Sequence, residues 1–361
     1  MPEEKMKTSR AIVYCILVVL GFFVGAELCL RAVGFRYQRN LSYLQFGYPN
    51  QVELHQVFEL DPKLIFRMKP GYDFGEGFEP LNRQGFRGKD FIAQKPLGVL
   101  RIACLGDSVT FGSAEGSYPA LLEQILNKKA GEKKFQVYNF GVPGYTSYQG
   151  RWLFEEVLEK YHPDLAVVFY GWNDHWLAKG FTDSEQKVEV EEGGLIQLRN
   201  ALAHLRLYQF LNWLIAHLNS AIFPKKEKFR VPIEEYDKNL KEMIQLARAH
   251  NCQLILATSP AGFGLAPLPD YLEYLGFIKK GEDLAQLHER YNQVVRKVAK
   301  AENVPLVDLD LIFRSQGVKN FFQNPEKDII HPNRKGMELI ANSVAGKIFQ
   351  VLSSANKEGG Q

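Results

Sequence analysis

Residues 99–112 read VLRIACLGDSVTFG, an apolar run of strand length that ends in a glycine, an aspartate and a serine. Apolar runs of this kind that alternate with segments of helical period are typical of a parallel sheet covered by helices on both faces. Four further apolar runs lie at 135–140, 165–170, 253–257 and 304–308. Segments with apolar residues at helical spacing lie at 118–129, 149–161, 233–250, 283–301 and 334–352. The fold is therefore predicted to be α/β with five strands, and its site is expected at their carboxyl ends.

The composition is that of an ordinary globular protein. Of 361 residues, 46% are hydrophobic and 24% are charged, which excludes a disordered or fibrous chain. Forty-four Lys and Arg against 41 Asp and Glu leave a net charge of +3, too balanced for a protein that mainly binds nucleic acid. The four cysteines, Cys15, Cys29, Cys104 and Cys252, show neither a disulfide framework nor zinc-ligand spacing. No metal site is therefore expected.

The N-terminal segment is predicted to be a membrane anchor. Residues 11–26 read AIVYCILVVLGFFVGA, and the apolar character continues past Glu27 to Leu30, which gives about the 20 residues that span a ~30 Å hydrocarbon core. Basic residues flank the segment on both sides, so charge indicates its orientation only weakly. A retained signal anchor over residues 1–36 is favoured over a cleaved signal peptide and over a buried core helix. Both membrane alternatives place the remaining chain outside the cytoplasm, in the periplasm or the extracellular space.

The rest of the chain divides by its sequence texture. Residues 37–97 are aromatic and punctuated by glycine and proline, which predicts short strands and loops that extend the main domain. The main domain is expected over 98–353, followed by a disordered tail at 354–361. Residues 176–232 form an insertion after the third strand, and its second half, from 205 to 223, is amphipathic. This half is predicted as a helix packed on the domain, with a lid and a membrane-surface contact as alternatives.

Four polar blocks follow the predicted strands or precede the last helix: GDS at 106–108, NFGVPG at 139–144, GWND at 171–174 and DIIHPN at 328–333. A serine that attacks an ester must lose its proton to a base, and histidine is suitable when a carboxylate holds its other nitrogen. Asp328 and His331 are three residues apart, so that in a turn the carboxylate reaches the imidazole. Ser108, His331 and Asp328 are therefore predicted as nucleophile, general base and third member of a catalytic triad.

The same blocks contain donors for the oxyanion that forms when a serine attacks an ester. Backbone N–H groups of Ser108 and Gly144, with the side-chain amide of Asn173, are expected to supply three donors. Glycine suits such a position because the backbone must approach the substrate closely, and an amide donates without carrying charge.

Together the four blocks resemble those of the SGNH hydrolases, also called the GDSL esterase/lipase superfamily, over residues 99–352. The resemblance implies a flavodoxin-like three-layer α/β/α sandwich around a five-stranded parallel sheet, with no metal or organic cofactor. It implies the same triad and oxyanion roles for the residues named above. Two positions depart from the common pattern: Val109 stands where many members have leucine, and Trp172 where many have glycine. Trp172 is expected to shape an acyl or sugar pocket, with Asp174 and His175 as further substrate-binding residues.

The function that follows is a membrane-anchored serine esterase of bacterial type, acting outside the cytoplasm through an acyl-enzyme. Similar anchored members act on acylated carbohydrates, so the expected substrate is an acylated small molecule or carbohydrate, such as an O-acetyl ester on a cell-surface or secreted saccharide. One alternative is an O-acyltransferase that uses the same triad on a polysaccharide, together with partner proteins of polysaccharide modification. The other is a non-catalytic binding module, against which the intact set of catalytic residues argues.

Overall fold

The computed structural model describes residues 2–38, 53–75, 77–129, 131, 134–178, 180–192, 195–222, 227–274, 276–322 and 324–358. The chain forms two compact units. The N-terminal unit comprises Met1–Leu60 and Gly194–Lys226, and the main unit comprises Asp61–Gly193 and Glu227–Gln361. This grouping differs from the expected domain boundaries, because the second half of the insertion belongs to the N-terminal unit and residues 61–97 belong to the main unit.

The main unit is built on a sheet in which all neighbouring strands are parallel. Its strands are β3 (Val99–Gly106), β4 (Lys134–Gly141), β5 (Leu165–Phe169), β6 (Gln253–Ala257) and β7 (Leu306–Val307), in the order β4-β3-β5-β6-β7. The predicted α/β fold with five parallel strands is thus confirmed. Gly106 at the end of β3 pairs with Gly141 on one side and Phe169 on the other. The loops after β3, β4 and β5 therefore start side by side, where the strand order reverses and α/β proteins carry their sites.

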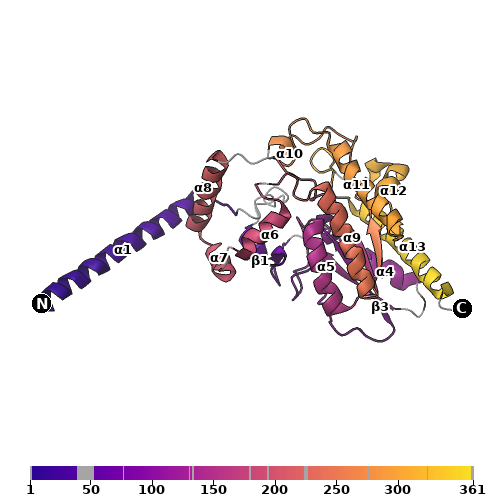
Figure 1. Ribbon diagram of the computed structural model, residues 1–361, viewed down its shortest axis with the longest axis horizontal. Helices are drawn as coiled ribbons and strands as arrows, with labels where there is room; N and C mark the ends of the chain where they lie inside the picture. The colour runs from indigo at the N-terminus through magenta and orange to yellow at the C-terminus, as the bar shows by residue number, and fades with distance from the viewer. Residues whose placement is uncertain are drawn as a thin grey trace. The chain divides into compact units, whose positions relative to one another are not determined.

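Helices cover both faces of the sheet (Figure 1). On one face, α4 (Tyr118–Lys129) packs against α13 (Arg334–Glu358), and on the other α9 (Ile233–Ala249) lies between α5 (Ser147–Tyr161) and α11 (Leu284–Ala301). The shorter helices of this unit are α3 (Ser108–Phe111), α6 (Asp183–Glu192), α10 (Tyr271–Tyr274), α12 (Leu309–Gln316) and the 3-10 helix η2 (Val318–Asn320). These layers form the expected α/β/α sandwich.

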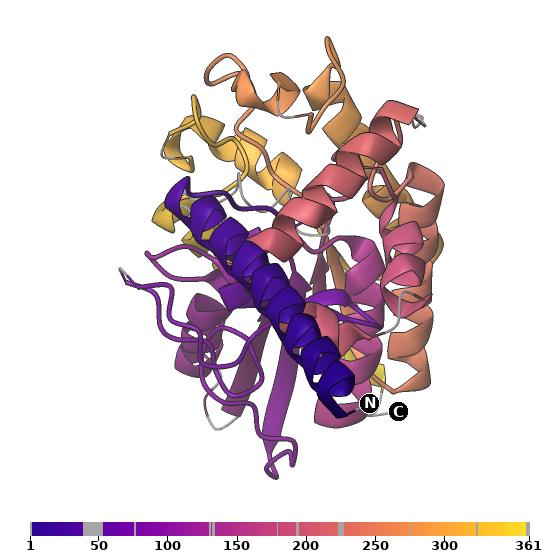
Figure 2. The ribbon, with the colours of Figure 1, turned by 90° about the vertical axis from the view of Figure 1, so that its left-hand side faces the viewer.

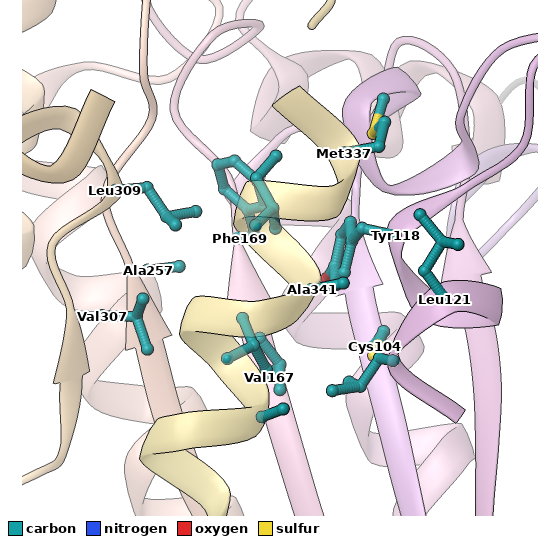
Figure 3. Close-up of a cluster of buried hydrophobic side chains, with 14 of the residues drawn as sticks. Cys104, Tyr118, Leu121, Val167, Phe169, Ala257, Val307, Leu309, Met337 and Ala341 are labelled. Carbon is teal, nitrogen blue, oxygen red and sulfur yellow. The ribbon is translucent and has the colours of Figure 1, made fainter. Parts of the chain in front are cut away.

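The core beneath α4 and α13 is built from side chains that project from one face of the sheet. Cys104 of β3 and Val167 and Phe169 of β5 are completely buried there, at the spacing of two that places residues on a common face. Figure 3 shows Tyr118 of α4 and Met337 of α13 in the same cluster. Burial of this apolar surface holds the two helices to the sheet.

The N-terminal unit contains α1 (Pro2–Ala32), α2 (Leu54–Val57), α7 (Ile196–Leu202) and α8 (Arg206–Ile222). Helix α1 is continuous in both views (Figures 1 and 2), and its segment Arg10–Ala32 is long and apolar enough to cross a membrane, with a mean hydropathy of 2.4. The short strands β1 (Phe58–Asp61) and β2 (Ile65–Met68) follow, within the region where short strands were expected. Residues 39–52 and 76 of that region lie outside the described part of the chain.

The closing helix is longer than expected. Helix α13 continues to Glu358, and residues 353–358 contain neither glycine nor proline, the two residues that most disfavour a helix. The tail predicted at 354–361 is therefore helical as far as Glu358, and residues 359–361 are not among those described.

Candidate active site

The turn after β3 presents Ser108 at the carboxyl edge of the sheet. Asp107 caps the one-turn helix α3, because its Oδ1 accepts a hydrogen bond from the amide of Val109 at 2.9 Å. The turn needs glycine on the neighbouring strand, since a Cβ at Gly141 would lie 2.2 Å from the amide nitrogen of Phe111. With Asp107 as the cap, the hydroxyl of Ser108 is free to point elsewhere.

That hydroxyl meets the imidazole of His331, which lies 223 positions further along the chain. Ser108 Oγ lies 2.8 Å from His331 Nε2, and His331 Nδ1 lies 2.7 Å from Asp328 Oδ2. The other carboxylate oxygen of Asp328 accepts the amides of Ile330 and His331, at 2.9 and 3.0 Å. With its proton on Nδ1, the imidazole donates to Asp328 and accepts from Ser108, which is the arrangement that a general base requires.

The pair Asp328–His331 shifts the pKa of each partner. Burial opposes the charged form of both groups, but their mutual attraction and hydrogen bond more than offset it. The pKa of His331 is therefore raised above its usual value, with a further contribution from the charge of Asp107. The pKa of Asp328 is lowered, with help from the two backbone amides. Asp328 is thus ionised when His331 works as a base.

Asp107 directly precedes Ser108 in the turn and its side chain is buried. Burial raises the pKa of Asp107 to about 6, although the amide of Val109 and the charge of His331 act in the opposite direction. Its hydrogen bonds make it part of the turn, and it does not contact the imidazole by any hydrogen bond among the described residues.

Asn173 contacts the two loops that carry the other two expected oxyanion donors, the amides of Ser108 and Gly144. Its Nδ2 donates to the carbonyl of Tyr145 at 3.0 Å and lies 3.4 Å from Asp107 Oδ2, so it links the loops after β4 and β3. The contact with Asp107 is the longer of the two hydrogen bonds that this amide group donates. Gly144 adopts a φ of 80°, a conformation that favours glycine. Within the described residues, the amides of Ser108 and Gly144 donate no hydrogen bond, so they are available to a substrate oxygen.

A buried ion pair that the sequence analysis missed holds the other side of Gly144. Arg230 Nη1 donates to the carbonyl of Gly144 at 2.9 Å, and its Nε and Nη2 donate to Asp183 at 3.0 and 2.8 Å. Thr146 Oγ1 also donates to Asp183, at 2.7 Å. Both charged residues come from the ends of the insertion, and both are buried. No local pattern signals this pair, because its members are 47 positions apart and act on a third segment.

Residues 61–97 support the same loops from another direction. Arg87 Nη1 donates to the carbonyls of Phe111 and Ser113, directly after the nucleophile turn, at 3.2 and 2.8 Å. The hydroxyl of Tyr145 donates to the carbonyl of Phe66 at 2.6 Å. The region predicted as an extension is thus tied to the loops after β3 and β4.

The three expected substrate-binding residues do not face outward. Trp172 is 2% exposed, and Asp174 and His175 are completely buried. Trp172 stacks on His288, with ring centroids 4.1 Å apart, and His175 Nε2 lies 2.9 Å from His288 Nδ1. Asp174 Oδ1 accepts the amide and the hydroxyl of Ser147. The structure therefore corrects the expectation of substrate contact: these side chains pack beneath the site because they point into the core while Asn173 between them does not.

Metal ligation was not expected from the sequence. Among the described residues, no group of three or more His, Cys, Asp or Glu side chains is arranged to hold a metal ion.

Comparison with known proteins identifies the family of the chain. The model of the GDSL-like lipase/acylhydrolase family matches residues 104–339, more than half of the chain, and the chain belongs to that family. It is accordingly a serine ester hydrolase. No curated protein sequence matches the chain.

Several solved structures are similar to the main part of the chain. A lipase/acylhydrolase from Enterococcus faecalis is 19% identical, with 69% of this chain and 95% of that chain covered and a TM-score of 0.43. An acetylxylan esterase from Geobacillus stearothermophilus is 18% identical, with 69% and 94% covered and a TM-score of 0.44. An α/β hydrolase from the metagenome of Lake Arreo, Spain, is 19% identical, with the same coverage and a TM-score of 0.43.

Proposed function

We propose that the protein hydrolyses acyl esters through a covalent intermediate on Ser108, with His331 as general base and Asp328 as its partner. The observation that carries this proposal is the unbroken hydrogen-bonded chain from Asp328 through His331 to Ser108. A non-catalytic module on the same fold would not need this chain, the available oxyanion donors or the raised pKa of the base.

The first step forms the acyl-enzyme. Ser108 Oγ attacks the carbonyl carbon of the ester, and its proton moves to His331 Nε2. The carbonyl oxygen becomes an oxyanion that accepts from the amides of Ser108 and Gly144 and from Asn173 Nδ2. His331 then gives the proton to the leaving alcohol oxygen as the bond between carbon and that oxygen breaks. Asp328 stabilises the imidazolium throughout.

The second step repeats this chemistry with water. His331 takes a proton from the water, the resulting hydroxide attacks the acyl carbon, and the same donors hold the oxyanion. The proton returns from His331 to Ser108 Oγ as the acid leaves. A sugar hydroxyl in place of water would give acyl transfer by the same residues.

Replacement of the nucleophile tests the triad. Ser108→Ala is expected to abolish hydrolysis of a short p-nitrophenyl ester and covalent labelling by a fluorophosphonate, because no other group forms the acyl bond. Ser315→Ala is the matched control, since Ser315 is an exposed serine of α12 whose hydroxyl donates to Ile312 O within its own helix. Unchanged turnover or labelling in Ser108→Ala protein of unchanged circular dichroism would reject the assignment.

The proposed substrate class is an O-acetylated carbohydrate at the cell surface. The support is the resemblance to anchored SGNH hydrolases that act on acylated saccharides, together with an N-terminal helix suited to hold the enzyme at a membrane. The test incubates the full chain with acetylated oligosaccharides, with and without unacylated acceptor saccharides, and identifies the products by mass spectrometry. Release of acetate is expected. An acetylated acceptor as the main product would identify a transferase instead. If the protein hydrolyses the p-nitrophenyl ester but none of the saccharides, only the proposed substrate class is rejected.

The proposed location is the outer face of a membrane, with α1 retained as a single-pass anchor. Most of the 23-residue segment Arg10–Ala32 is apolar and exposed, so a hydrocarbon environment would bury that apolar surface.

A further inference from the structure

Helix α8 carries an apolar stripe that its own unit, the N-terminal unit, leaves exposed among the described residues. Leu211, Leu214, Ile215 and Leu218 recur at helical spacing and are each between 37% and 52% exposed. The helix contains no acidic residue, and its charged Arg206 lies buried at the N-terminal end. A continuous apolar stripe of this kind on a protein surface usually marks a site of contact with another protein or with a membrane.

The N-terminal end of α8 is hydrogen-bonded to the C-terminal end of the candidate membrane span. Glu27 Oε2 of α1 accepts the amide of Leu207 at 2.8 Å, and Arg31 Nη2 donates to the carbonyl of His204 at 3.0 Å. Glu27 and Arg31 also pair with each other, at 2.7 Å. The acidic residue of the span is thus satisfied at the helix junction, which matters because an unpaired carboxylate is costly in a bilayer.

Aromatic rings also pack at the junction between α1 and α8. Phe35, just beyond α1, packs against Phe210 and Trp213 of α8, with centroids 5.7 and 6.2 Å apart. Phe210 and Trp213 stack on each other at 5.6 Å. Aromatic side chains at the end of a membrane span are typical of the interface between hydrocarbon and water.

The length of α1 places this junction at the edge of a bilayer. Glu27 lies about 25 Å along the helix from Arg10, at ~1.5 Å per residue. That distance approaches the ~30 Å thickness of the hydrocarbon core. If Arg10 lies at one surface, Glu27 and the start of α8 lie near the other.

We propose that α8 lies in the interface of the membrane that α1 crosses, with its exposed leucine and isoleucine stripe in contact with lipid. This inference rests on the proposed anchoring of α1 and goes beyond it, because it assigns a second lipid-binding element, about 180 positions further along the chain. The occupant of the stripe is then the lipid bilayer itself.

Spin labels on the full chain in vesicles of phosphatidylcholine and phosphatidylglycerol test the inference. The exposed Cys15 and Cys29 are first changed to alanine. Cys104 and Cys252 are buried, and burial raises the pKa of each thiol to about 12, so neither is expected to be labelled. Single labels are then placed by Leu218→Cys on α8, Val18→Cys within α1 and Leu311→Cys on α12. Leu218 and Leu311 are equally exposed leucines, at 52% and 55%, and serve as the matched pair.

The label at position 218 is expected to be relaxed more strongly by oxygen, which concentrates in lipid, than by a water-soluble nickel complex. The label at position 18 should show the same preference for oxygen. The label at position 311 should show the opposite preference, for the nickel complex. A nickel preference at 218 beside an oxygen preference at 18 would overturn this inference and leave the anchor intact. Protection from both reagents at 218 would also overturn it, because protein then covers the stripe. A nickel preference at 18 would reject the anchor and the inference together.

Discussion

The imidazole of His331 interacts with two carboxylates of different function. Asp328 contacts Nδ1 directly, whereas Asp107 acts only through its charge from below the nucleophile turn. Both favour the protonated imidazole, so the pKa of His331 is raised. Because the neutral imidazole is the base, hydrolysis is expected to be lost as the pH falls through this raised pKa.

Asp328→Asn is expected to shift that acidic limb. Loss of the carboxylate lowers the pKa of His331, so the limb of kcat/KM against pH moves to lower pH, and kcat falls by about 10⁴-fold because the tautomer is no longer held. The measurement is a pH–rate profile with the p-nitrophenyl ester. Glu302→Gln, which changes a carboxylate paired with Arg248, is expected to leave the limb in place. An unmoved limb in Asp328→Asn would show that Asp328 does not set the pKa of the base.

Asn173→Ala is expected to lower kcat by roughly 10²–10³-fold with little change in KM, because the amide would stabilise the oxyanion of the transition state more than the ground-state ester. Steady-state kinetics measure the two constants separately. Asn127→Ala is the control: like Asn173, Asn127 donates its side-chain amide to the backbone, here to the carbonyls of Glu123 and Phe135, away from the site. A rise in KM without a fall in kcat would make Asn173 a residue that binds the ground state.

The elements around the site are joined by contacts between segments that are distant in sequence. The two ends of the insertion meet, since Arg230 N donates to Trp176 O and the amide of Asp183 donates to Arg230 O. This pairing delivers the Arg230–Asp183 ion pair to the loop after β4. The insertion therefore supports Gly144 through the hydrogen bond from Arg230 to the Gly144 carbonyl.

Arg230→Lys is expected to test that support. Lysine keeps the charge but cannot reach Asp183 and the carbonyl of Gly144 together with the geometry of a guanidinium. We expect kcat to fall by about tenfold to a hundredfold with KM nearly unchanged, because the Gly144 amide is then less well placed for the oxyanion. Arg151→Lys, at the Arg151–Glu242 pair between α5 and α9, is the control and is expected to leave kcat unchanged. Equal kcat in both variants would limit Arg230 to a structural role.

For the chain as a whole, the expected outcome is retention in the membrane. The full-length protein should stay in the pellet after an alkaline carbonate wash with its N-terminus intact, because α1 is long enough to span the hydrocarbon core. Val18→Lys with Leu20→Lys should release it, since each lysine at the centre costs about 3 kcal/mol. Val33→Lys, beyond the span, is the control and should remain in the pellet. A shortened chain in the soluble fraction would indicate a cleaved signal peptide.

The chain order predicted which polar residues gather at the sheet edge. Apolar runs ended at GDS, NFGVPG and GWND, and parallel strands place such ends side by side, so Ser108, Gly144 and Asn173 could be assigned to one site. The adjacent Trp172, Asp174 and His175 were misjudged because neighbours in a turn can point in opposite directions. Sequence proximity to Asn173 carries no information on which of them is buried.

What local sequence determines here is the set of strands, helices and turns, because periodicity, glycine and capping residues act over a few positions. The pairing of Asp328 with His331 belongs to this class, since both lie in one turn. The contact of His331 with Ser108, the ion pair behind Gly144 and the junction of α1 with α8 depend instead on the folded chain. Each joins segments between 86 and 223 positions apart, and only the packing of the whole determines which of the many distant polar groups meet.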